Sequence, residues 1–137
     1  MKRLDLRRLA RAKLGDAKLL LEHGRASNAY YLSGYAIELA LKACIAKQIS
    51  EDTIPDKNFI KNVYSHDFPT LAGLAGLSRE LKNEIARDLS FSANWAITCE
   101  WLPDARYKSY TSFEAQTLVE AVEHSDHGVL KWIRRFW

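Results

Sequence analysis

Apolar residues recur with helical spacing along almost the whole chain, and the alternation typical of β strands is nearly absent. The first such stretch, residues 4–22, carries one apolar stripe and ends before Gly24, a residue suited to a left-handed helix C-cap. The second begins at Ser27 or Asn28 and continues to about residue 48. It is apolar nearly all round, which predicts a central, buried helix, and Gly34 within it predicts a close helix–helix contact.

The remainder of the chain predicts shorter elements and one longer final helix. The expected elements are a loop or short irregular helix over residues 50–65, a short helix beginning at 66–70, helices over 78–89 and 90–101, and a loop over 104–110. Thr111 and Glu114 fit a capping box, in which a hydroxyl and a carboxylate each accept from a backbone N–H. This box starts a final helix whose apolar positions continue to Trp137. The pattern as a whole predicts an all-α fold, an up-down bundle of four to five helices.

The composition fits one soluble domain spanning residues 1–137. Of these residues 47% are hydrophobic and 27% are charged, which argues against disorder. The longest uncharged stretch, residues 26–37, is too short to cross a bilayer, and no signal peptide is expected at the N-terminus. Cys44 and Cys99 lie in apolar surroundings without a metal-binding spacing. We therefore expect two reduced, buried thiols in a cytoplasmic protein with no membrane partner.

The net charge of +3 is distributed unevenly along the sequence. Residues 1–13 contain six basic side chains and one acidic one, and residues 131–137 contain three basic side chains and no acidic one. The stretch between them is net acidic. Basic ends of this kind either contact phosphate groups or form solvated helix faces, and the sequence leaves both interpretations open.

Two pairs of polar residues accompany the apolar helices. Glu38 and Lys42 stand four apart on the most apolar helix, in the order that favours an ion pair. The pair lies either on an exposed strip of that helix or in a site or dimer interface. His66 and Asp67 precede a helix start, where Asp67 can cap the helix and His66 can bond to a neighbouring one.

A loop with a phosphate-binding composition follows Pro103. Arg106 suits bidentate phosphate contacts, Tyr107 offers a stacking face, and Lys108 adds a charge. The structural alternative is that Arg106 docks on a carboxylate such as Glu38. A weaker pattern, Glu120 with His124 and His127, could place three ligands on one helix face, but we predict no metal site and no cofactor.

Three segments in order resemble the HEPN family (higher eukaryote and prokaryote nucleotide-binding). Ala36 to Lys42 matches the pattern A-x-E-x-x-L-K of the family's core helix. His66-Asp67-Phe68 with Leu71 is similar to its H-x-L-x-x-L segment, and Asp104 to Tyr107 is similar to its A-R-Y loop. The final helix, with Trp132 and Ile133, also resembles the family's closing helix, so the resemblance covers nearly the whole chain.

The resemblance implies a four- to five-helix bundle, commonly a homodimer, that acts on nucleotides or RNA. Many members are metal-independent ribonucleases or toxins, often paired with a small nucleotidyltransferase that neutralises them. Those ribonucleases carry arginine, four to six residues, then histidine. In this sequence none of the ten arginines has a histidine five to seven positions later. Lys18 precedes His23 by five, but lysine lacks the arginine fork.

Three hypotheses follow. The first is a non-catalytic module that binds a nucleotide, RNA or a partner protein, as a homodimer or beside a nucleotidyltransferase-type partner, in a toxin–antitoxin or defence setting. Its phosphate-binding residues would be Lys42, Arg106, Tyr107 and Lys108, supported by Glu38, His66, Asp67 and Trp95. The second is a metal-independent ribonuclease in which His66 is the base and Arg106 contacts the phosphate. The third is a purely structural dimerisation bundle.

Overall fold

The structure is a computed structural model that describes residues 1–49 and 51–137. Within these residues the elements are all helical, as the apolar spacing predicts. Their bounds are α1 Arg3–Glu22, α2 Ala26–Ala46, α3 Lys57–Val63, α4 Phe68–Leu74, α5 Ser78–Arg87, α6 Leu89–Cys99, the 3-10 helix η1 Pro103–Tyr107, α7 Ser112–Glu123 and α8 Val129–Ile133. No described helix is both long enough and apolar enough to cross a membrane.

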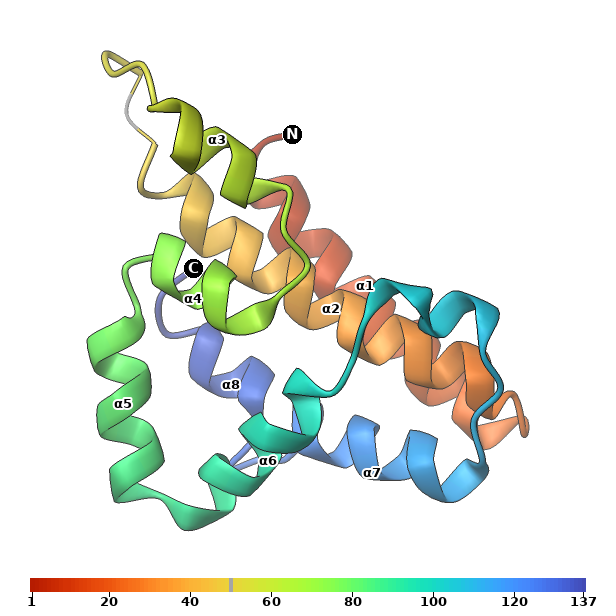
Figure 1. The fold of residues 1–137 in the computed structure, drawn as a ribbon. Helices are drawn as coiled ribbons and strands as arrows, with labels where there is room; N and C mark the ends of the chain where they lie inside the picture. Colours follow the sequence, from red (N-terminus) through yellow and green to blue (C-terminus); the bar gives the residue numbers. More distant parts are fainter. Residues whose placement is uncertain (50) are drawn as a thin grey trace.

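Helices α1 and α2 form an antiparallel hairpin along which the rest of the chain is arranged (Figure 1). The hairpin turns at Gly24, whose φ of 72° lies in the left-handed region that glycine adopts without strain, as expected for a C-cap glycine. Helix α2 is the most buried helix and contacts α1, α4, α7, α8 and η1. Its apolar sides therefore meet the bundle on several faces, which confirms it as the central helix.

Side-chain caps fix the starts of four helices. Asp56, Asp67 and Asp88 each accept a backbone N–H three residues later, at the starts of α3, α4 and α6. At α7, Thr111 and Glu114 form the predicted capping box, with both bonds at 3.1 Å. These caps satisfy donors that a helix leaves unpaired, so they determine where the short helices begin.

The prediction of one final helix reaching Trp137 is wrong. Helix α7 ends at Glu123, and α8 begins after Gly128. The Nδ1 atom of His124 accepts the backbone N–H groups of Asp126 and His127, at 3.1 and 3.0 Å, which stabilises a turn in place of a helix. A Cβ at Gly128 would lie 2.4 Å from the carbonyl oxygen of His124, so the turn needs glycine at that position.

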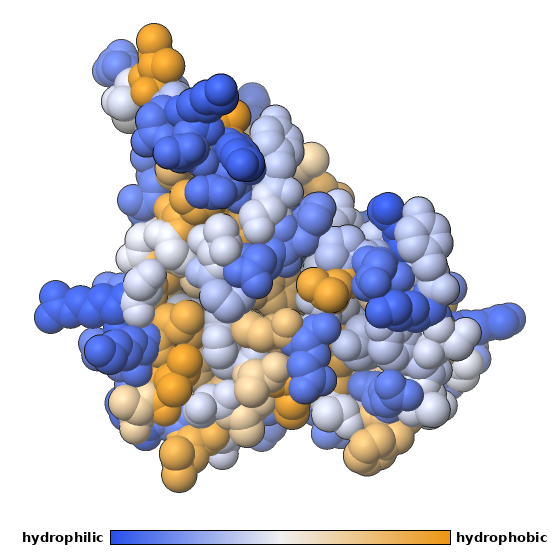
Figure 2. Space-filling view, viewed as in Figure 1, coloured by the Kyte–Doolittle hydropathy of each residue, from blue (hydrophilic) through white to orange (hydrophobic). Residues whose placement is uncertain are grey.

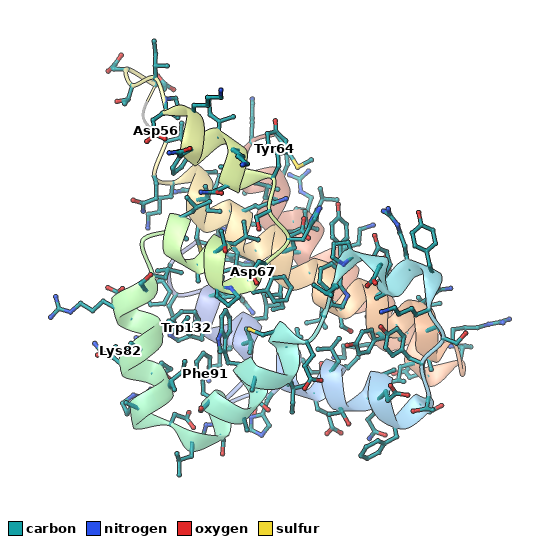
Figure 3. All side chains as sticks on the ribbon, in the orientation of Figure 1. Asp56, Tyr64, Asp67, Lys82, Phe91 and Trp132 are labelled. Carbon is teal, nitrogen blue, oxygen red and sulfur yellow. The ribbon has the colours of Figure 1, made fainter. Side chains whose placement is uncertain are left out.

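An aromatic core joins the later helices to the hairpin. Phe91 of α6 lies beside Trp132 of α8, with ring centroids 5.3 Å apart (Figure 3). Trp101, 1% exposed, stacks on Phe68 of α4. On the surface, hydrophilic residues cover α3, whereas apolar residues gather over α5 and α6 (Figure 2). The core thus lies between α2 and the layer formed by α4, α6, α7 and α8.

Candidate functional site

The candidate site is a row of polar side chains along one face of α2, which we call the α2 row. It consists of Tyr31, Tyr35, Glu38 and Lys42. Their spacing of four, three and four residues places them on one face of an α helix. Helix α4 and η1 both contact α2 and contribute further residues to the same region.

Glu38 is a buried carboxylate with two cationic or polar partners. It is 3% exposed, and its two oxygens accept from separate groups: Lys42 Nζ at 2.8 Å and His66 Nδ1 at 2.9 Å. A buried carboxylate is costly unless it is paired and hydrogen-bonded, and here both oxygens are satisfied. The interpretation of Glu38 and Lys42 as a pair on an exposed strip is therefore wrong, although the ion pair itself is present.

Next to His66, Asp67 caps the start of α4 and fixes where this helix begins (Figure 3 labels Asp67). Asp67 Oδ2 accepts from the backbone N–H of Thr70 at 2.9 Å and from its hydroxyl at 2.6 Å, which confirms the predicted cap. The side chain of His66 is 52% exposed. With Nδ1 occupied by Glu38, the Nε2 atom is the ring nitrogen that remains for a ligand or a proton.

Trp101 packs between α2 and α4. Its indole N–H donates to the carbonyl of Tyr31 at 3.1 Å, and its ring stacks on Phe68 and on Tyr31 at centroid distances of 5.5 and 6.0 Å. A Cβ at Gly34 would lie 2.1 Å from Cγ of Trp101. The close contact predicted at Gly34 is therefore made by this indole, which follows α6, and not by another helix.

The segment after Pro103 was expected to be a loop and is the 3-10 helix η1, which buries one of its side chains and exposes others. Ala105 is buried at 1% exposure, whereas Arg106 and Tyr107 are exposed. The guanidinium carbon of Arg106 lies 4.8 Å from the centroid of the Tyr107 ring. The hydroxyl groups of Tyr107 and then Tyr31 raise the pKa of Arg106, and η1 as a whole contacts α2.

Other expected contacts are absent among the described residues. Arg106 makes no ion pair with Glu38, whose oxygens are taken by Lys42 and His66. Lys108 pairs with Asp104 at 3.1 Å, within η1 and its flank. Trp95, expected to stack on a base, is 7% exposed and packs edge-on against Trp132 in the core. Its position therefore removes it from the site.

The weak metal pattern is broken by the turn after α7. Glu120 bonds to Gln116, and His127 Nδ1 lies 2.6 Å from Asp88 Oδ2. The described residues contain no group of three ligands that could hold a metal ion.

Burial raises the pKa of the Cys44 thiol to about 11 and that of Cys99 to about 12. Cys44 is buried and Cys99 is half-buried, both as free thiols.

The sequence reasoning did not single out Tyr31 and Tyr35 as site residues. The rings of these two tyrosines lie 6.0 Å apart and nearly parallel. Burial, and then the charge of Glu38, raise the pKa of Tyr35. The signal that could have identified them is their spacing from Glu38 and Lys42 on one helix face.

A family model described as the HEPN domain matches residues 4–133, nearly the whole chain. No curated protein and no solved structure matches the sequence. The matched range contains the α2 row, the start of α4 and η1.

Proposed function

The chain belongs to the HEPN family, and we propose that its α2 row and η1 bind the phosphate and base of a nucleotide or of RNA without breaking a bond. The observation that carries the proposal is the exposed pair of Arg106 and Tyr107 beside this row. A guanidinium supplies paired N–H donors for phosphate oxygens, and a tyrosine ring supplies a face on which a base can stack. Tyr107 is 78% exposed, so one ligand can reach both groups.

Lys42 offers a second phosphate contact along α2, eleven residues or about 16 Å of helix rise from Tyr31, which suits another phosphate of an RNA strand. Its Nζ is held by Glu38, and its side chain is 21% exposed, so the ammonium reaches the surface in a fixed position. A positioned cation loses less conformational freedom on binding than a mobile one. Glu38 and Asp67 act as positioning residues, the first for Lys42 and His66 and the second for the start of α4.

Binding is favoured over cleavage because the sequence lacks the arginine–histidine spacing of the ribonuclease members. His66 and Arg106 also contact different parts of α2. His66 bonds to Glu38, whereas Arg106 lies by Tyr31, seven residues earlier. Seven residues of α helix rise by about 10 Å, which separates the two side chains along the helix axis.

Binding can be tested by fluorescence anisotropy with a labelled single-stranded oligoribonucleotide, and by calorimetry with ATP. Arg106→Ala is expected to weaken binding at least about tenfold, the loss of one charge-assisted hydrogen-bonded contact. Arg106→Lys should recover only part of the affinity, because lysine keeps the charge but lacks the fork. Arg79→Ala, which removes an exposed arginine from α5, is the charge-matched control and should bind as wild type.

Two results would refute the proposal. One is the absence of binding to both probes. The other is an equal loss of affinity in Arg106→Ala and Arg79→Ala, which would indicate attraction by net charge without a defined site.

A second candidate function, metal-independent RNA cleavage, is favoured by the Glu38–His66 pair. A carboxylate on Nδ1 orients a histidine so that Nε2 can accept a proton. In this reaction Nε2 takes the proton of a 2′-hydroxyl, and the oxygen attacks the adjacent phosphorus. The bond to the 5′-oxygen breaks, and that oxygen takes a proton from solvent. The products are a 2′,3′-cyclic phosphate and a free 5′-hydroxyl.

Cleavage is tested with labelled structured RNA in excess EDTA, comparing wild type with His66→Ala and Glu38→Gln. Cleavage that is lost in the first variant and reduced in the second would establish this activity. RNA that stays intact at every protein concentration would exclude it, and equal cleavage by His66→Ala would exclude His66 as the base.

The family membership also motivates proposals about partners. We propose a homodimer as the working assembly, with a small nucleotidyltransferase-type protein as a further partner in a toxin–antitoxin or defence setting. Light scattering after size-exclusion chromatography tests the dimer. A monomeric mass at every concentration would reject it, and co-purification with a nucleotidyltransferase encoded next to this chain tests the second partner.

A further inference from the structure

The two basic ends of the sequence meet in space around one aromatic ring. Arg7 and Arg11 of α1 and Arg134, directly after α8, lie with their guanidinium carbons 5.3, 5.0 and 5.8 Å from the centroid of the Trp137 ring. Each contact is a cation–π interaction, worth about 0.5–1 kcal/mol at an exposed site. The three positive charges around one ring also repel one another, so the cation–π contacts alone do not explain why the arginines gather there.

These arginines line a cleft of about 580 Å³ between α1, the end of α7 and α8. Lys131 and Arg135 also line it, which brings five basic side chains into one concavity. We call this concavity the α1–α8 cleft. Concave surfaces that carry one sign of charge raise the local concentration of the opposite ion.

The carboxylates near the α1–α8 cleft are already engaged. Glu123, its one acidic lining residue, pairs with Lys18 at 2.8 Å, outside the cleft lining. At the rim Asp126 lies 3.9 Å from Lys131, and Glu84 lies 4.0 Å from Arg135. Among the described residues no carboxylate forms an ion pair with Arg7, Arg11 or Arg134.

Arg7 supplies the observation that points to a ligand. Its Nε is fully buried and has no hydrogen-bond partner among the described residues. A buried unpaired donor on a charged group is costly, and such donors are rare in folded proteins. The side chain lines the cleft, and no carboxylate among the described residues balances its charge, so an anion bound there would supply that balance.

We propose that the α1–α8 cleft is a second anion site, separate from the α2 row, which takes a ligand carrying at least two neighbouring phosphate groups. Guanidinium forks bind phosphate oxygens bidentately, and the three arginines without a carboxylate partner carry more positive charge than one phosphate balances. The Trp137 ring is already contacted by three guanidiniums, so it offers no free face for a base. The cleft therefore recognises phosphates and not bases, in contrast to the site proposed at Arg106 and Tyr107.

The test uses inorganic tripolyphosphate as the probe, with calorimetry and thermal unfolding as the measurements. Wild type should bind it and unfold at a higher temperature in its presence. Arg134→Gln and Arg7→Gln should each weaken binding at least about tenfold. Arg79→Gln, on α5, is the matched control and should retain both the affinity and the rise in melting temperature.

Thermal unfolding without ligand separates a binding role from a structural one. If the arginines exist to bind phosphate, relief of repulsion should leave the ligand-free melting temperature of Arg134→Gln at or above that of wild type. A lower melting temperature together with an unchanged response to tripolyphosphate would overturn the proposal. So would the absence of tripolyphosphate binding to wild type, or equal binding by Arg134→Gln and Arg79→Gln.

A second arm distinguishes a nucleic-acid backbone from a small oligophosphate. With a labelled single-stranded oligoribonucleotide over a series of KCl concentrations, each phosphate contact adds about −0.7 to the slope of log K against log salt. A backbone ligand predicts a shallower slope in Arg134→Gln by about that amount, whereas a small oligophosphate predicts no change. Arg106→Ala should leave tripolyphosphate binding intact, so this inference and the proposed function can fail separately.

Discussion

Replacing Gly34 with alanine is expected to destabilise the fold by about 2–4 kcal/mol. The new Cβ would lie 2.1–2.3 Å from three atoms of the Trp101 ring, so the ring or α2 must move. Overpacking costs about 1–3 kcal/mol, and a displaced indole also loses about 1 kcal/mol for its bond to Tyr31 and about 1 kcal/mol of stacking. Alanine returns about 1 kcal/mol of helix propensity, which is smaller than these losses.

The assay is urea unfolding with a parallel thermal scan, in which the melting temperature should fall by about 6–15 °C. Gly15→Ala is the matched control, because Gly15 lies inside α1 and a Cβ there meets nothing within 4 Å. It should stabilise the protein by up to about 1 kcal/mol through helix propensity alone. If Gly34→Ala proves as stable as Gly15→Ala, the reasoning about the Trp101 contact is refuted.

Three further predictions concern charges and thiols. Lys42→Met should lower the free energy of unfolding by about 1–3 kcal/mol, because it leaves the buried carboxylate of Glu38 without its lysine partner. Glu38→Gln should lower it by less, because it removes the buried charge itself. Equal losses of the two variants in urea unfolding would contradict this prediction. The backbone N–H of Phe91 and then the side chain of His127 lower the pKa of Asp88, so this carboxylate stabilises the fold above its unfolded pKa of about 3.9 and loses that contribution as the pH falls further. The difference in the free energy of unfolding between wild type and Asp88→Asn should therefore narrow below about pH 4. A difference that stays constant with pH would contradict this prediction. Cys44, whose pKa burial raises to about 11, should react with a disulfide reagent near pH 8 far more slowly in the folded than in the urea-unfolded protein, as followed by absorbance.

The elements predicted best are those with strong local signals. The central role of α2 follows from apolar residues all round it, and the start of α7 follows from the pairing of Thr111 with Glu114. Both signals act within one or two turns, so no information about distant parts of the chain is needed. The cap by Asp67 belongs to the same class.

The break between α7 and α8 was missed because the apolar spacing continues across it. Leu118, Val122, Val129 and Ile133 keep helical intervals, and all four are buried on either side of the turn. The signal against a continuous helix was the turn-forming sequence from Ser125 to Gly128. Periodicity reports which residues are buried, and it does not report whether the backbone between them is unbroken.

Contacts between distant segments decided the parts of the site that the sequence left open. The sequence offered Glu38 as a carboxylate for Arg106 and left the neighbouring helix that His66 would contact unspecified, and the approach of α4 brings His66 to Glu38. Trp95 had the composition of a stacking residue, but the position of Trp132 placed it in the core. Likewise, the convergence of Arg7 with Trp137 joins residues from the two ends of the sequence, which no local pattern specifies.

The two proposed phosphate sites differ in charge balance, and this difference makes them separable in one experiment. In the α2 row the buried Glu38 offsets the charge of Lys42, so the binding of a phosphate there depends on the position of the ammonium more than on net charge. The α1–α8 cleft holds three arginines, Arg7, Arg11 and Arg134, that have no carboxylate partner among the described residues, so attraction there rests on charge. The part of the affinity that Arg134→Gln removes should accordingly fall steeply with salt, whereas the part that Lys42→Met removes should depend on salt less. A salt series on the two variants therefore assigns each component of binding to its own surface.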